Sequence, residues 1–98
     1  MTNKDYILSK IKQHKKELNS LGIIKIGLFG SYARDEQSAN SDIDILIEFA
    51  PDKENFDNYM TVYDILENLF GNERVEVVTK KGLSPYIGPH ILNEVLYA

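Results

Sequence analysis

Residues 27–46 read GLFGSYARDEQSANSDIDIL, and this stretch decides the fold. An apolar run over 23–29 ends at Gly30 and Ser31, and a polar segment over 35–41 leads to Asp42 and Asp44 at the start of a second apolar run. Alternate residues of a strand point to the same face, so both aspartates aim at one place. Like charges that close are costly without a cation between them, so the pattern predicts a cation site there.

The turn at Gly30 and Ser31 predicts a place for a phosphate. We expect residues 30–34 to begin a short helix. The backbone N–H groups at such a helix start, together with a hydroxyl, can hold an anion. A phosphate cradle beside a site for a hard metal ion indicates nucleotide chemistry.

Hydrophobic periodicity along the rest of the chain predicts alternating helices and strands. We expect helices over 2–20, 58–70 and from Ile87 or Pro89 to Tyr97, and strands over 23–29, 42–49 and 75–79. The predicted fold class is α+β (mixed α/β), with a small mixed sheet of three to four strands and helices packed mainly on one face. A length of 98 residues predicts a single domain over 1–98.

Glu76 lies between Val75 and Val77 in the third predicted strand, where a carboxylate needs a partner. If the second and third strands are neighbours, Glu76 joins Asp42 and Asp44. Three such carboxylates suit one or two Mg²⁺ ions and in-line nucleotidyl transfer, and the third carboxylate could act as a general base. Taken alone, Asp42 is better interpreted as a cap at the start of its strand than as a metal ligand, and Ser31 is better interpreted as a helix N-cap than as a phosphate contact.

Composition narrows the class of protein. The net charge is −4, which makes sequence-independent nucleic-acid binding unexpected, and the chain has no cysteine. No apolar run approaches the length of a membrane span, and the first residues do not resemble a signal peptide. We therefore expect a cytoplasmic protein that contacts neither nucleic acid nor membrane directly.

The motifs resemble those of the DNA polymerase beta-like nucleotidyltransferases, whose signature is Gly-Ser, a ten-residue gap and Asp-x-Asp. Here the gap runs from Tyr32 to Ser41. Within that superfamily the size and the C-terminal segment 84–97 resemble the minimal nucleotidyltransferases, the small prokaryotic antitoxins of toxin–antitoxin modules whose partner is a HEPN-domain protein.

This resemblance implies the nucleotidyltransferase fold and a role for each motif residue. Gly30 and Ser31 would hold the phosphates of ATP, and Asp42 and Asp44 would bind Mg²⁺, with two ions expected. Glu76 falls where the family usually has a third metal-binding aspartate, and its extra methylene moves the carboxylate by up to about 1.5 Å.

Two further positions bear on the phosphate cradle. Arg34 is a candidate nucleotide-binding residue, with a salt bridge as the alternative reading. Asp35 stands where the family often has glycine, which affects the turn out of the predicted short helix.

Three functions follow from the resemblance. The first is transfer of AMP from ATP to a protein hydroxyl, with a tyrosine of a HEPN RNase toxin as the acceptor, so that the chain acts as an antitoxin. The second is a weakly active or inactive binding module that neutralises its partner by occlusion, and the third is transfer to a small molecule such as an antibiotic. A chain of 98 residues leaves little room for an acceptor domain, and the apolar last helix with the first helix predicts a partner interface.

Overall fold

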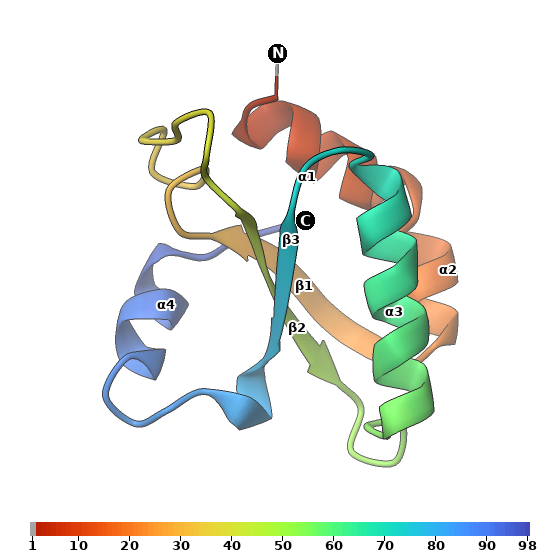
Figure 1. Cartoon of the computed structure of the whole chain (residues 1–98). Coiled ribbons are helices and arrows are strands. Elements are labelled where there is room, and N and C mark those ends of the chain that lie inside the picture. The colour runs from red at the N-terminus through yellow and green to blue at the C-terminus, as the bar shows by residue number, and fades with distance from the viewer. Residues whose placement is uncertain (1) are drawn as a thin grey trace.

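The computed structural model describes residues 2–98. A four-stranded mixed sheet forms its centre, in the order β3-β2-β1-β4. Strand β1 (Ile23–Phe29) is antiparallel to β2 (Ile43–Phe49) and to β4 (Leu96–Tyr97), whereas β3 (Val75–Thr79) runs parallel to β2. Helices α1 (Lys4–Gln13), α2 (Lys15–Ser20) and α3 (Phe56–Leu69) lie together on one side of this sheet, and α4 (Gly88–Glu94) lies on the other (Figure 1). The predicted fold class is confirmed.

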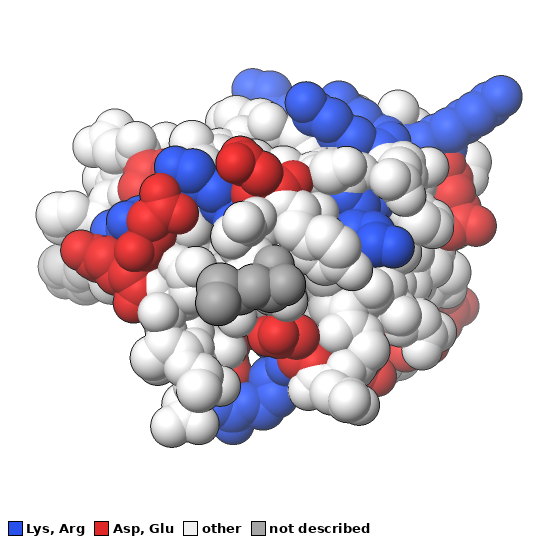
Figure 2. Space-filling model, turned by 90° about the horizontal axis from the view of Figure 1, so that it is seen from above, with Lys and Arg blue, Asp and Glu red and all other residues white. Residues whose placement is uncertain are grey.

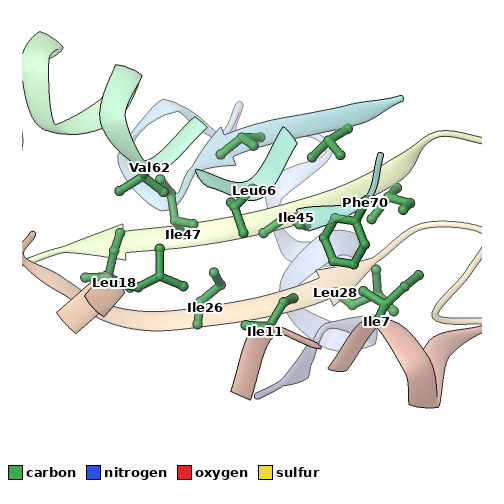
Figure 3. Packing of buried hydrophobic residues seen from close by; sticks show 14 of the residues in the cluster. Ile7, Ile11, Leu18, Ile26, Leu28, Ile45, Ile47, Val62, Leu66 and Phe70 are labelled. Carbon is green, nitrogen blue, oxygen red and sulfur yellow. The ribbon is translucent and has the colours of Figure 1, made fainter. Parts of the chain in front are cut away.

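The apolar core fills the space between the sheet and the first three helices. Odd-numbered residues 43, 45, 47 and 49 of β2 are all buried, as a strand with one core-facing side requires. Val62 and Leu66 of α3 meet this face from one side, while Ile7 and Ile11 of α1 reach it from another (Figure 3). The even-numbered face of β2, which carries Asp44, therefore lies on the side away from α1–α3.

The first predicted helix is interrupted. The prediction of one helix over 2–20 is wrong at His14, where α1 ends and α2 begins. The His14 ring donates to the Lys10 carbonyl at 3.1 Å, while the His14 backbone N–H turns to the Ile11 carbonyl at 3.0 Å. The ring thus takes the acceptor that the backbone would use in a continuous helix.

The C-terminus is the second correction. The predicted last helix ends at Glu94, and Leu96–Tyr97 form an edge strand beside β1. The Ala98 N–H donates to the Ile26 carbonyl at 2.9 Å, so the open edge of β1 supplies backbone partners that a helix would not use. Gly27 permits the approach, because a Cβ there would lie 2.6 Å from the Val95 side chain.

Other boundaries differ by smaller amounts. Helix α3 begins at Phe56, two residues before the prediction, because Asn55 Oδ1 accepts the Asn58 N–H at 2.8 Å as an N-cap. A 3-10 turn (Lys80–Gly82) follows β3. None of the helices described over residues 2–98 is both long and apolar enough to cross a membrane.

Candidate active site

The end of β1 and the starts of β2 and β3 meet at one end of the sheet and form the candidate site. Asp44 pairs with Glu76 across the parallel β2–β3 ladder, and Phe29 pairs with Asp44 across the antiparallel β1–β2 ladder. The chain leaving β1 at Gly30 therefore arrives beside the first residues of β2. The structure thus confirms that the strands bearing Asp44 and Glu76 are neighbours.

Gly30 lies directly against Asp44. Its φ is +79°, a left-handed conformation that favours glycine, and a Cβ built on it would collide with the Asp44 carboxylate. Only a glycine fits both the backbone angle and the space. The close approach brings the Gly30 backbone, the predicted phosphate contact, next to the predicted metal ligand.

The short helix expected after Gly30 is not formed. Residues 31–35 make turns instead, closed by the Glu36 N–H donating to the Ser31 carbonyl at 2.8 Å. Asp35 ends them with a φ of +58°, the conformation that glycine would adopt most easily and that Asp tolerates. The predicted anion site is therefore built from individual turn N–H groups rather than from a helix start.

Asp44 is the most perturbed acid of the site. Burial, contact with the Glu76 carboxylate and the nearby charge of Asp42 raise the pKa of Asp44 from 3.8 to about 7, although Arg34 opposes the rise. Asp44 is half-buried, whereas Glu76 is exposed on the edge strand β3. Asp44 therefore keeps its proton to a higher pH than an ordinary aspartate when no cation neutralises the site.

Asp42 does not complete a three-carboxylate cluster. Because Ile43 pairs with Val75, Arg74 lies next to Asp42, and Arg74 Nε approaches Asp42 Oδ1 at 2.9 Å. The contact is too poorly aligned for a hydrogen bond, so this buried oxygen has no hydrogen-bond donor. Among residues 2–98 no group of three His, Asp or Glu side chains is arranged to hold a metal. Asp44 and Glu76 stand side by side while Asp42 turns toward Arg74, and the role of the three as metal ligands stays a prediction.

Arg34 forms salt bridges, which were predicted from the sequence as the alternative to nucleotide binding. Its Nε lies 2.7 Å from Glu36 Oε1, and its Nη1 lies 2.8 Å from Glu94 Oε2. Glu94 also accepts the Gly30 N–H, with 3.1 Å between Gly30 N and Glu94 Oε1. Sequence reasoning missed Glu94 and Arg74, because each meets its partner across 30 residues or more of chain and no local pattern signals such a contact.

Two hollows lie along β3, one at the candidate site and one away from it. One of about 370 Å³ borders the site and is lined in part by Asp42, Glu76, Tyr59 and Tyr63. Another of about 540 Å³ lies toward the other end of β3, and none of the six predicted site residues lines it. The surface charge above the site end is mixed in sign, as Figure 2 shows for the face seen from above.

Comparison with known proteins adds to this geometry. A family model described as a nucleotidyltransferase domain matches residues 9–98. Protein adenylyltransferase MntA of Thermococcus cleftensis is 38% identical over 98 residues, covering 99% of this chain and 97% of its own length. A Methanocaldococcus jannaschii relative assigned as a protein adenylyltransferase is 41% identical over 99 residues, covering 92% of this chain and 96% of its own.

Solved structures share the fold. A minimal nucleotidyltransferase superposes with a TM-score of 0.82 at 25% identity, covering 97% of this chain and 95% of that one. A crystal structure of a toxin–antitoxin with AMP-PNP gives a TM-score of 0.68 at 23% identity, covering 98% of this chain and 72% of that one, which shows the fold alone. Since the family model spans most of the residues and the relatives match end to end, this chain belongs to the nucleotidyltransferase domain family and is a nucleotidyltransferase enzyme.

Proposed function

We propose that this chain transfers AMP from ATP to a tyrosine hydroxyl of a HEPN-type RNase toxin, in a reaction that depends on Mg²⁺, and that it thereby acts as an antitoxin. Relatives named protein adenylyltransferase support a protein acceptor, and the toxin–antitoxin structure with AMP-PNP supports both a toxin partner and an adenine nucleotide. The exposed side chains of Tyr86, Ile87 and Leu92, in and just before α4, support the predicted partner surface.

The observation that carries the proposal is the Asp44–Glu76 pair set against the Gly30 backbone. Two adjacent carboxylates on neighbouring strands, one with a pKa raised to about 7, form a site where negative charge is concentrated and only partly offset by Arg34. The turn that would face a phosphate begins within contact of the same carboxylate.

Asp42, Asp44 and Glu76 offer the carboxylate oxygens that Mg²⁺ prefers, although Asp42 must turn to join the other two. Asp42 Oδ1 is buried and accepts no hydrogen bond although Arg74 Nε lies 2.9 Å away, so a cation that takes the place of Arg74 would satisfy it. Asp42, Asp44 and Glu76 would hold the ions, which supply charge neutralisation on the phosphates and lower the pKa of the acceptor hydroxyl. Glu76 stands directly opposite Asp44. Rotation about the bonds of its longer side chain can therefore bring its carboxylate toward Asp42 and Asp44.

The remaining residues orient the nucleotide. The Gly30 N–H and the Ser31 hydroxyl would donate to the leaving phosphates, and Arg34 would offset their charge once it is released from its acidic partners. The acceptor hydroxyl must come in line from the side of the carboxylates, so that its oxygen attacks the α-phosphorus as pyrophosphate leaves and its proton passes to Glu76, the predicted general base. Only the partner protein would supply that hydroxyl.

Label transfer tests this proposal. The chain is incubated with ATP labelled in the α-phosphate, Mg²⁺ and the product of the neighbouring gene, and transfer of label to that protein is expected. The Asp44→Asn and Asp42→Asn variants should lose transfer while remaining folded. Absence of label transfer by the unaltered chain, while it still neutralises the toxin, would contradict the proposal.

A second function is favoured by a specific observation. Asp42 is turned to Arg74, and Glu94 occupies the Gly30 N–H and Arg34, so these predicted site residues are engaged with side chains from elsewhere in the chain. This arrangement suits a binding module that neutralises its partner by occlusion. In that case Asp42→Ala and Asp44→Ala would leave protection intact, whereas Ile87→Asp on the exposed apolar surface would abolish it.

A further inference from the structure

The Glu94 carboxylate sits where an anion would be expected. One oxygen, Oε1, accepts the Gly30 N–H at 3.1 Å, and the other, Oε2, lies 2.8 Å from Arg34 Nη1. The side chain is 27% exposed, so water reaches the contact without filling it. A backbone N–H and a guanidinium together form a cradle for two oxygens of one anion, and Glu94 fills it.

The same two donors are those expected to face the nucleotide's phosphates. An N–H directed at one carboxylate oxygen cannot donate fully to a second acceptor, and the negative charge of Glu94 opposes the arrival of a triphosphate. We infer that Glu94 competes with the phosphates for the Gly30 N–H and Arg34, so that nucleotide binds only when the Glu94 carboxylate leaves the cradle. This inference rests on the proposed function only in placing phosphates at Gly30.

The surroundings allow Glu94 to leave. It is the last residue of α4, a helix in which only Gly88 is buried. The chain turns to an extended conformation at the next residue, Val95, with φ −63° and ψ 136°. Val95 packs against Gly27 and the next two residues pair with β1, so Glu94 leaves the cradle by turning its partly exposed side chain rather than by a shift of the helix.

Arg34 would lose little on release from Glu94. Its Nε keeps Glu36 Oε1 at 2.7 Å, so the guanidinium stays in place when Nη1 is freed. Glu36 thereby holds Arg34 ready for the phosphates without touching the Gly30 N–H. That difference between the two glutamates supplies a matched control.

The test measures ligand affinity rather than transfer. Binding of ATP and, separately, of inorganic tripolyphosphate to the full chain is titrated calorimetrically with Mg²⁺ present, for the unaltered chain, Glu94→Gln and Glu36→Gln. Glu94→Gln removes the competing charge while keeping the side chain's size, so both ligands should bind about 3- to 10-fold more tightly. Glu36→Gln leaves Glu94 on the Gly30 N–H and loosens Arg34, so it should not tighten the binding of either ligand.

Several outcomes would overturn the inference. Unchanged or weaker binding of tripolyphosphate in a folded Glu94→Gln chain would show that Glu94 supports the turn rather than competing with the ligand. If that variant does not fold, Glu94→Asp, whose shorter side chain cannot reach both donors, must show the same tightening. Tripolyphosphate that binds as expected while ATP binds to neither chain would contradict the proposed function instead, and loss of both signals would overturn both.

Discussion

Replacement of Asp44 by Asn tests the electrostatics of the site through stability alone. The pKa of Asp44 in the folded chain is raised from 3.8 to about 7, so the folded state binds more protons than the unfolded state between those values. The free energy of unfolding must therefore fall as the pH rises from about 4 to about 7, because deprotonation leaves Asp44 charged in a partly buried position beside Glu76. Asp44→Asn keeps the shape of the side chain and removes this pH-dependent fall in the free energy of unfolding.

The magnitude follows from the same values. A rise from 3.8 to about 7 corresponds to at most ~4 kcal/mol at 1.36 kcal/mol per pH unit. Asp44 is only half-buried and water screens part of the repulsion, so we expect ~1–2 kcal/mol. Relative to the unaltered chain, Asp44→Asn should gain this much stability as the pH is raised from about 4 to 8.

Urea unfolding at a series of pH values measures the difference directly. Asp52→Asn, which changes an exposed loop carboxylate, serves as the control and should show no such trend. Addition of Mg²⁺ at pH 8 should then stabilise the unaltered chain and not Asp44→Asn, because only the former keeps the ligand. A stability difference that stays flat with pH would refute the account of the Asp44–Glu76 pair.

Three further changes probe the scaffold and the turn. Gly30→Ala should destabilise the chain by ~2 kcal/mol or more and abolish nucleotide binding, because its Cβ collides with Asp44. Gly71 also has a positive φ, +60°, but a Cβ there meets no other atom, so Gly71→Ala should cost only ~1 kcal/mol and retain binding in the same titration. Leu66→Ala, at a fully buried position, should cost ~2–5 kcal/mol in urea unfolding, and a loss below ~1 kcal/mol would contradict the packing described for α3. Asn55→Ala removes the N-cap of α3 and should lower the unfolding free energy by ~0.5–2 kcal/mol, whereas an unchanged value would mean that the cap is not formed in solution.

Prediction from sequence succeeded where local pattern and burial act together. The alternation in β2 places Ile43, Ile45 and Ile47 in the core and Asp44 on the opposite face, as expected from period-two spacing. The glycine turn at Gly30 was also found correctly, since few residues tolerate its backbone angle. These features depend on residues that are close together in the chain, so a short stretch of sequence is enough to predict them.

Prediction failed where a distant partner offered a better contact. Residues 96–97 carry no strand signal of their own and become β4 because the edge of β1 is open beside Gly27. The short helix after Gly30 was predicted from motif spacing, but Asp35 closes the segment as turns. The first failure is a tertiary contact that overrides a weak local preference, whereas the second is a local turn closed by the Glu36 N–H on the Ser31 carbonyl.

Local sequence pattern was enough to predict candidate residues for the site and to place Asp44 on the face of β2 opposite the core. It could not determine how their charges are paired, because Arg74 reaches Asp42 and Glu94 reaches Gly30 only once the strands and α4 are in place. Coulomb energy and hydrogen-bond geometry vary steeply over a few ångströms, and those distances are set by the fold rather than by order along the chain. The state of the site, with Asp44 paired to Glu76 and Gly30 N–H held by Glu94, is therefore a property of the tertiary structure.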